Sequence, residues 1–96
     1  MYVLTPSHKI VNVERCTQIL VEETGQGYQI QAITAPRDDR IVLAEFSETQ
    51  KMVAGDVLEQ LACSISSAQS DHSVINLEVI YKQAVYEFET GRIYEP

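Results

Sequence analysis

The sequence predicts an α+β fold in which an antiparallel meander sheet of four to five short strands is packed by one long amphipathic helix. Three alternating apolar runs lie between residues 17 and 46, and turn residues separate them, which is typical of strands joined by hairpins. Apolar residues then recur at helical spacing from Val53 to Ala68. A weaker helical pattern from Leu77 to Phe88 predicts a second, C-terminal helical segment.

The length of 96 residues predicts a single domain, residues 1–96, with one hydrophobic core. No stretch is long and apolar enough to cross a membrane, and residues 1–6 lack the basic and apolar regions of a signal peptide. We therefore expect a cytoplasmic protein. Cys16 and Cys63 are expected to be reduced thiols, because one pair of cysteines does not make a disulfide framework.

The strands are expected in the first half of the chain. Residues 1–4 and 9–11 form two short strands around a turn that contains Pro6. Residues 17–23, 28–34 and 40–46 form the three-stranded meander. Gly25 and Gly27 are expected to supply the positive φ angles of the first hairpin turn, and residues 35–39 form the second turn.

The last strand of the meander is apolar on both sides. Strict alternation places Ile41 and Leu43 on one face, and the other face receives Val42, Ala44 and Phe46. A strand that is apolar on both sides is usually covered on both sides. Leu20 and Ile33 extend the second apolar face onto the neighbouring strands. The residues predicted to form an interface are therefore Leu20, Ile33, Val42, Ala44 and Phe46.

The long helix is expected from Glu48 to about Ala68. Ser47 and Gln50 form a Ser-x-x-Gln capping-box sequence at its start. Gly55 lies within the helix, where glycine costs about 1 kcal/mol relative to alanine, and is a candidate point of close backbone approach.

Residues 69–90 fit two descriptions. Alternating apolar residues from Ile75 to Tyr81 are compatible with a strand. Helix is preferred, because the apolar pattern lasts for more than fourteen residues and Gly91 is suited to the position after a helix end. Residues 92–95 are a candidate edge strand.

No motif predicts a catalytic, metal or cofactor site, so we expect a protein that is not an enzyme. Asp71, His72 and Ser73 are consecutive and cannot converge as a hydrolase triad. The histidines and cysteines lack metal-site spacing. The carboxylate pairs at 22–23 and 38–39 should lie at opposite ends of the meander. The remaining catalytic alternative is a Cys16 nucleophile that His8 activates across a hairpin.

The charge pattern argues against nucleic acid as a partner. The net charge is −7, from 14 acidic and 7 basic side chains, and the basic ones are scattered along the chain. The densest charged cluster, residues 37–40, contains two arginines and two aspartates and is expected to be a self-compensated hairpin turn.

Four short segments resemble a group of small proteins of firmicutes and their phages whose function is unknown. They are the strand at residues 1–4, the Ile-Val-Asn-Val segment at 10–13, the strand-to-helix junction at 41–48 and the aromatic-Xaa-Pro ending at 93–96. Their order is that of the family, whereas residues 69–90 depart from its pattern. The resemblance implies a small sheet-plus-helix domain and no particular activity.

Two functions remain. The first is a non-enzymatic binding or assembly protein that forms a homodimer through the apolar sheet face, or binds another protein there. The second is an acidic regulator that docks on a basic protein, such as one that itself binds nucleic acid.

Overall fold

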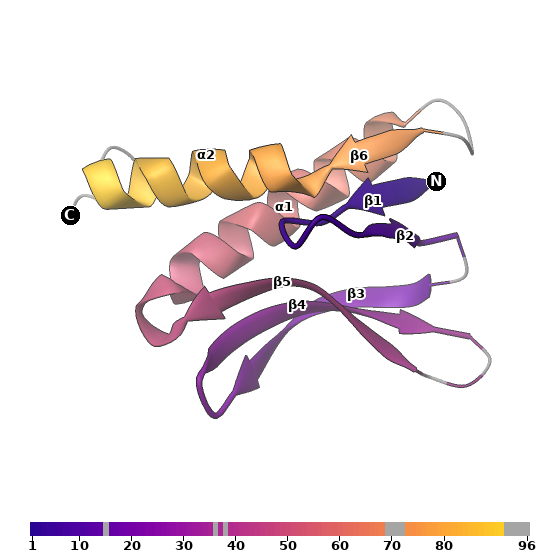
Figure 1. Cartoon of the computed structure of the whole chain (residues 1–96), viewed down its shortest axis with the longest axis horizontal. Helices are drawn as coiled ribbons and strands as arrows, with labels where there is room; N and C mark the ends of the chain where they lie inside the picture. The colour runs from indigo at the N-terminus through magenta and orange to yellow at the C-terminus, as the bar shows by residue number, and fades with distance from the viewer. Residues whose placement is uncertain (15, 36, 38, 69–72, 92–96) are drawn as a thin grey trace.

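The computed structural model describes residues 1–14, 16–35, 37, 39–68 and 73–91 and has an α+β fold (Figure 1). In chain order the described elements are β1 (Tyr2–Leu4), β2 (Ile10–Asn12), β3 (Cys16–Thr24), β4 (Gly27–Thr34), β5 (Arg40–Ser47), the 3-10 turn η1 (Glu48–Gln50), α1 (Lys51–Ser67), β6 (Val74–Asn76) and α2 (Leu77–Thr90). The predicted edge strand at 92–95 lies outside the described residues.

The strands form two three-stranded sheets, which corrects the prediction of one meander of four to five strands. The predicted meander is present as β3-β4-β5, and both of its pairings are antiparallel. The first two strands instead join β6 in a separate sheet of order β2-β1-β6. In that sheet β1 pairs with β2 antiparallel and with β6 parallel.

Strand β6 explains why residues 69–90 fitted two descriptions. Residues 74–76 pair with β1, and helix α2 begins directly afterwards. Asn76 caps that helix, because its side-chain Oδ1 accepts a hydrogen bond from the backbone N–H of Val79 at 3.1 Å. The prediction that Gly91 follows the end of this helix is confirmed, since Gly91 has a left-handed φ of 73° and donates its N–H to the Phe88 carbonyl oxygen.

The long helix begins through a 3-10 turn that follows Ser47. The side-chain Oε1 of Gln50 accepts from the backbone N–H of Ser47 at 2.9 Å, as a capping box requires. Gly55 is not a point of close approach within the chain, because a Cβ at this position would meet nothing within 4 Å.

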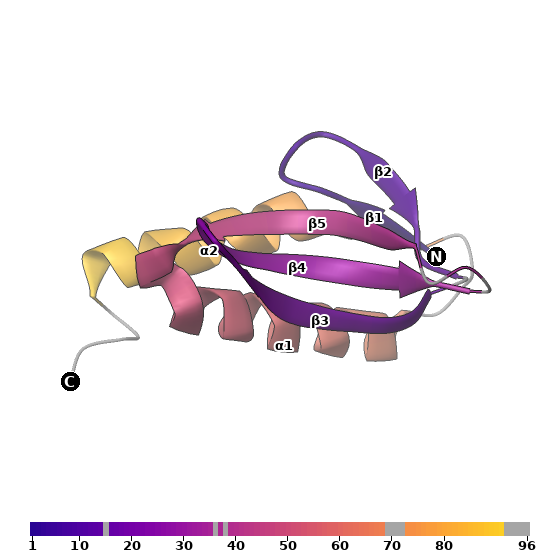
Figure 2. The same ribbon diagram turned by 90° about the horizontal axis from the view of Figure 1, so that it is seen from below.

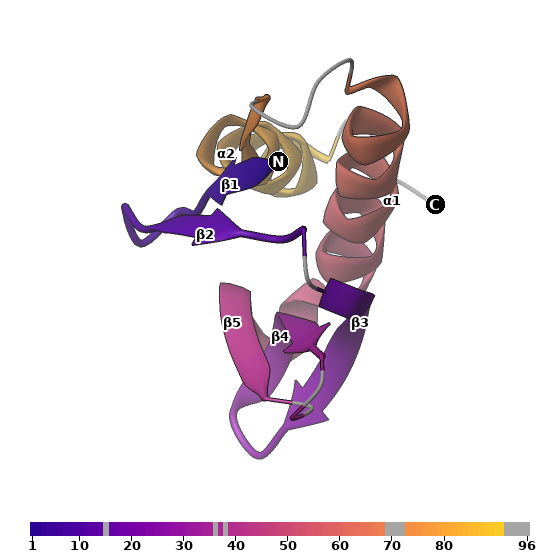
Figure 3. The same ribbon diagram turned by 90° about the vertical axis from the view of Figure 1, so that its right-hand side faces the viewer.

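One hydrophobic core joins both sheets and both helices. Its fully buried side chains include Val3 from β1, Ile30 from β4, Leu61 from α1 and Leu77 from α2. Helix α1 lies on one face of the β3-β4-β5 sheet and toward its β3 side, whereas the β1–β2 hairpin lies beyond β5 (Figures 2 and 3). No described helix or strand covers the opposite face of this sheet, which we call the open face.

Candidate interaction surfaces

The open face carries three of the five residues predicted to form an interface. Leu20 and Val42 both pair with Gln31 of β4, so the side chains of Leu20, Gln31 and Val42 form one row across the sheet. Ile33 lies in the adjacent row, where it pairs with Gln18 and Arg40. Leu20 and Ile33 are half-buried, and Val42 is 40% exposed.

Ala44 and Phe46 lie on the opposite, helix-covered face, which corrects their predicted placement. Ala44 pairs with Ile30 and Val42 pairs with Gln31, so Leu43 is an extra residue in β5 and forms a β-bulge. The bulge resets the alternation of side chains. As a result Leu43, Ala44 and Phe46 all join the core, with exposures of 1%, 4% and 6%. Of the apolar residues in β5, only Val42 therefore lies on the open face.

Polar side chains connect the rest of the open face. Arg40 donates to the Gln31 side-chain oxygen at 2.9 Å, and Gln31 donates to that of Gln29 at 2.8 Å. The Arg40 guanidinium also lies 3.6 Å from the carboxylate of Glu22. Both side chains of this ion pair are about half exposed, so its contribution to stability is small. Gln31 is only 8% exposed, and the two hydrogen bonds explain how its amide is satisfied. On the open face the apolar side chains of Leu20, Ile33 and Val42 are thus interspersed with hydrogen-bonded polar ones, since Gln31 lies between Leu20 and Val42.

A second surface follows the outer edge of β3, which is the side away from β4. A cavity of about 350 Å³ lies between this edge and α1 and is lined almost entirely by apolar atoms. An adjoining cavity of about 340 Å³ shares Ile19 and Ile65 with it. We call the two together the β3 groove. Its first part is lined by Ile19, Leu58, Glu59, Leu61, Ala62 and Ile65.

Sequence reasoning missed the β3 groove. Leu58, Ala62 and Ile65 follow one another at helical spacing, but they lie beside the fully buried stripe of α1. The signal available in the sequence was the width of the apolar stripe on this helix, which is greater than contact with one sheet face requires.

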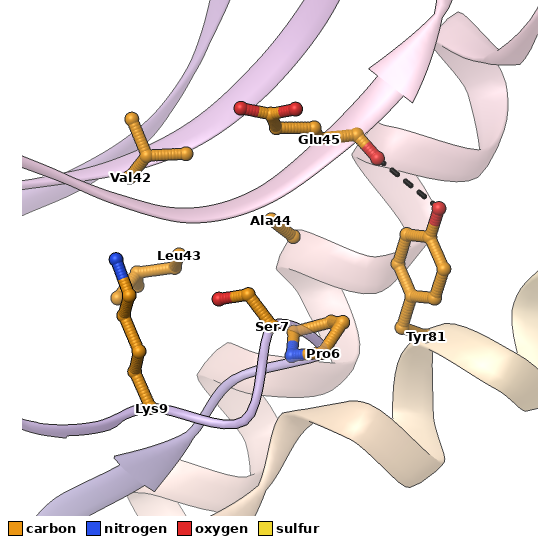
Figure 4. Close-up of a pocket in the computed structure, with 8 residues that line it drawn as sticks. All are labelled: Pro6, Ser7, Lys9, Val42, Leu43, Ala44, Glu45 and Tyr81. Carbon is orange, nitrogen blue, oxygen red and sulfur yellow. Dashed lines mark hydrogen bonds between the residues drawn. The ribbon is translucent and has the colours of Figure 1, made fainter.

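A third hollow separates β5 from the turn of the β1–β2 hairpin (Figure 4). Its volume is about 460 Å³, and Lys9, Glu45 and Tyr81 are among its lining residues. The Tyr81 hydroxyl donates to the backbone carbonyl of Glu45 at 3.2 Å, and the Tyr81 ring packs on Phe46 with centroids 5.2 Å apart. Burial, and then the nearby charge of Glu45, raise the pKa of Tyr81 above its ordinary value of 10.0.

Replacing Tyr81 with phenylalanine is expected to destabilise the fold by about 1 kcal/mol, because the Phe46 contact remains and one hydrogen bond is lost.

Because folding raises the pKa of Tyr81, the Tyr81 hydroxyl ionises at a lower pH in the unfolded chain than in the folded one. Stability from Tyr81 is therefore complete below pH 10 and is lost as pH rises through the folded pKa. Urea unfolding at pH 7 and at increasing pH measures both effects. Unchanged stability at pH 7 would contradict the assigned hydrogen bond.

The structure does not bring the candidate catalytic residues together. His8 lies in the hairpin turn with its Nδ1 3.1 Å from Glu78, whereas Cys16 begins β3 and lines the β3 groove. Burial raises the pKa of the Cys16 thiol, which disfavours the nucleophilic thiolate. Glu22 and Asp39 lie near opposite ends of β4, as predicted. Asp38, Asp71 and His72 lie outside the described residues.

Within the described ranges, no three His, Cys, Asp or Glu side chains gather as metal ligands. No described helix is long and apolar enough to span a membrane. No family model matches this chain, and neither a curated protein nor a solved structure matches it significantly.

Proposed function

We propose that this chain is a non-enzymatic assembly module that forms a homodimer through the open face of the β3-β4-β5 sheet. The observation that carries the proposal is that three apolar side chains, Leu20, Ile33 and Val42, lie on a sheet face that no described element covers. Polar side chains lie between them, and a non-obligate protein interface is about as apolar as the rest of a protein surface. A two-fold dimer would bury the same three side chains on both copies.

The polar side chains of the open face support a role in binding rather than in catalysis. A carboxylate, two amides and a guanidinium are engaged with one another across the face. His8 and the partly buried thiol of Cys16 lie in different parts of the molecule. We therefore assign no catalytic or cofactor-binding residue.

The solution mass at low micromolar concentration, measured by light scattering coupled to size exclusion, tests the proposal. The wild-type chain is expected to have the mass of a dimer, and Val42→Lys is expected to give a monomer, because it replaces one of the three apolar side chains of the open face with a charge. The matched control is Val79→Lys, since Val79 is an exposed valine on α2, and this variant should remain dimeric. A monomeric wild-type chain, or equal effects of the two variants, would refute self-association through this face.

A further inference from the structure

Strand β3 has an unpaired outer edge. It is the outermost strand in the order β3-β4-β5, it is nine residues long, and no described strand pairs with its outer side. Alternate backbone N–H and C=O groups of an edge strand point outward and can pair with another extended segment. The other edge of this sheet differs, because the backbone carbonyl of Glu45 in β5 already accepts a hydrogen bond from the Tyr81 hydroxyl.

The β3 groove places an apolar wall beside these free backbone groups. Helix α1 projects past β3 (Figure 2). Its residues Leu58, Ala62 and Ile65 line a hollow next to Ile19. A segment that added to the β3 edge would lie beneath this wall. Its alternate side chains would point toward α1 and contact apolar atoms, because side chains in a strand alternate between the two faces.

The charged residues that line the groove within the described part of the chain are acidic. Glu59 lines its first part and Glu14 its second. Glu22 of β3 lies on the open face, next to the place where the other alternate side chains of an added strand would lie, and its carboxylate remains about half exposed although it is 3.6 Å from the Arg40 guanidinium. Opposite charges on neighbouring strands are favourable, and like charges are not.

We propose that the β3 groove binds an extended segment of a partner protein by strand addition, and that this segment alternates apolar with basic side chains. The apolar residues face α1, and the lysines or arginines face the open side near Glu22. Strand addition of this kind obtains affinity from main-chain hydrogen bonds and specificity from alternate side chains. The proposal is independent of self-association through the open face.

A second copy of the chain fits this groove less well than a basic segment. Helix α1 projects past β3 on one face of the sheet (Figure 2). Two copies joined through β3 in one continuous sheet would both carry this helix on the same side, where the two helices would meet. Each copy would also bring a net charge of −7 to an acidic groove. The geometry and the charge therefore favour a partner of opposite sign that has no helix at this position.

A labelled peptide of the same length as β3, in which valine and lysine alternate, is the probe. Fluorescence anisotropy with the intact chain is expected to show saturable binding that weakens as salt is added. Ala62→Lys should reduce the affinity about tenfold or more, because it places a like charge in the groove. The matched control is Cys63→Lys, which adds the same charge one residue away at an exposed position that does not line the groove, and it should bind almost as the wild type does.

A measurement on the unmodified chain makes the test independent of the variants. Saturating peptide should slow hydrogen exchange at alternate backbone amides of β3, because the outward amides gain partners. The proposal is overturned if the valine–lysine peptide does not saturate, or if a valine–glutamate peptide binds equally well. It is also overturned if the two lysine variants behave alike, or if the β3 amides are unaffected.

Discussion

Replacing Gly27 with alanine is expected to destabilise the fold by roughly 2 kcal/mol or more, through backbone strain and a steric clash. Gly27 is buried and has a φ of 151°, which L-residues rarely adopt. A Cβ at this position would collide with the backbone carbonyl oxygen of Phe46 and would lie 3.0 Å from the carbonyl carbon of Ser47. These neighbours are backbone atoms of β5, so the clash can be relieved only by separating β4 from β5.

Gly25→Ala in the same turn is the matched control. A Cβ at Gly25 would meet nothing within 4 Å, and Gly25 is exposed and has no positive φ. Urea unfolding of the two variants at neutral pH measures the difference directly. Equal midpoints for both variants would show that the close approach of Gly27 to β5 does not constrain the fold.

The same pair of glycines shows what a local pattern can predict. The turn and its position were predicted correctly, because two glycines between alternating apolar runs are a local signal. The prediction that both glycines have a positive φ was wrong, since of the two only Gly27 has one. The need for glycine at position 27 comes from β5, which approaches it from about twenty residues further along the chain.

The elements that depend on nearby residues were predicted well. The three meander strands and the long helix were placed to within a few residues, and Gln50 and Gly91 act at the helix ends as predicted. The separate sheet was not predicted. Strand β6 has three residues and pairs with β1 at the other end of the chain, so neither its length nor its spacing gives a local signal.

The residues predicted to form an interface were placed on the right face of the sheet only where alternation is regular. Leu20 and Ile33 lie in unbroken stretches of their pairings and occupy the predicted face. Ala44 and Phe46 follow the bulge at Leu43, and one extra residue moves every later side chain to the opposite face. The bulged strand opposes Ile30 and Gln31 of β4, so its position depends on pairing that the sequence of β5 alone does not show.

Leu61→Ala is expected to cost roughly 3 kcal/mol of folding free energy, within the usual range for a buried leucine. The Leu61 side chain is fully buried between α1 and the sheets and belongs to the single core of the molecule. Thermal unfolding should register the loss as a fall in Tm of roughly 4–8 °C for each kcal/mol. A fall of only a few degrees would mean that the surrounding core collapses into the cavity.

Leu58→Ala in the same helix makes the comparison informative about function as well as stability. Leu58 is only half-buried and lines the β3 groove, so its truncation should cost roughly 1 kcal/mol of stability, less than the truncation of Leu61. If the groove binds an extended segment, Leu58→Ala should weaken the valine–lysine peptide while the fold remains intact. Leu61 also lines the groove but is fully buried, so Leu61→Ala should lower stability more, and any loss of binding should accompany that loss of stability. The comparison of two leucines three residues apart thus separates a loss of binding in a stable fold from a loss that follows destabilisation.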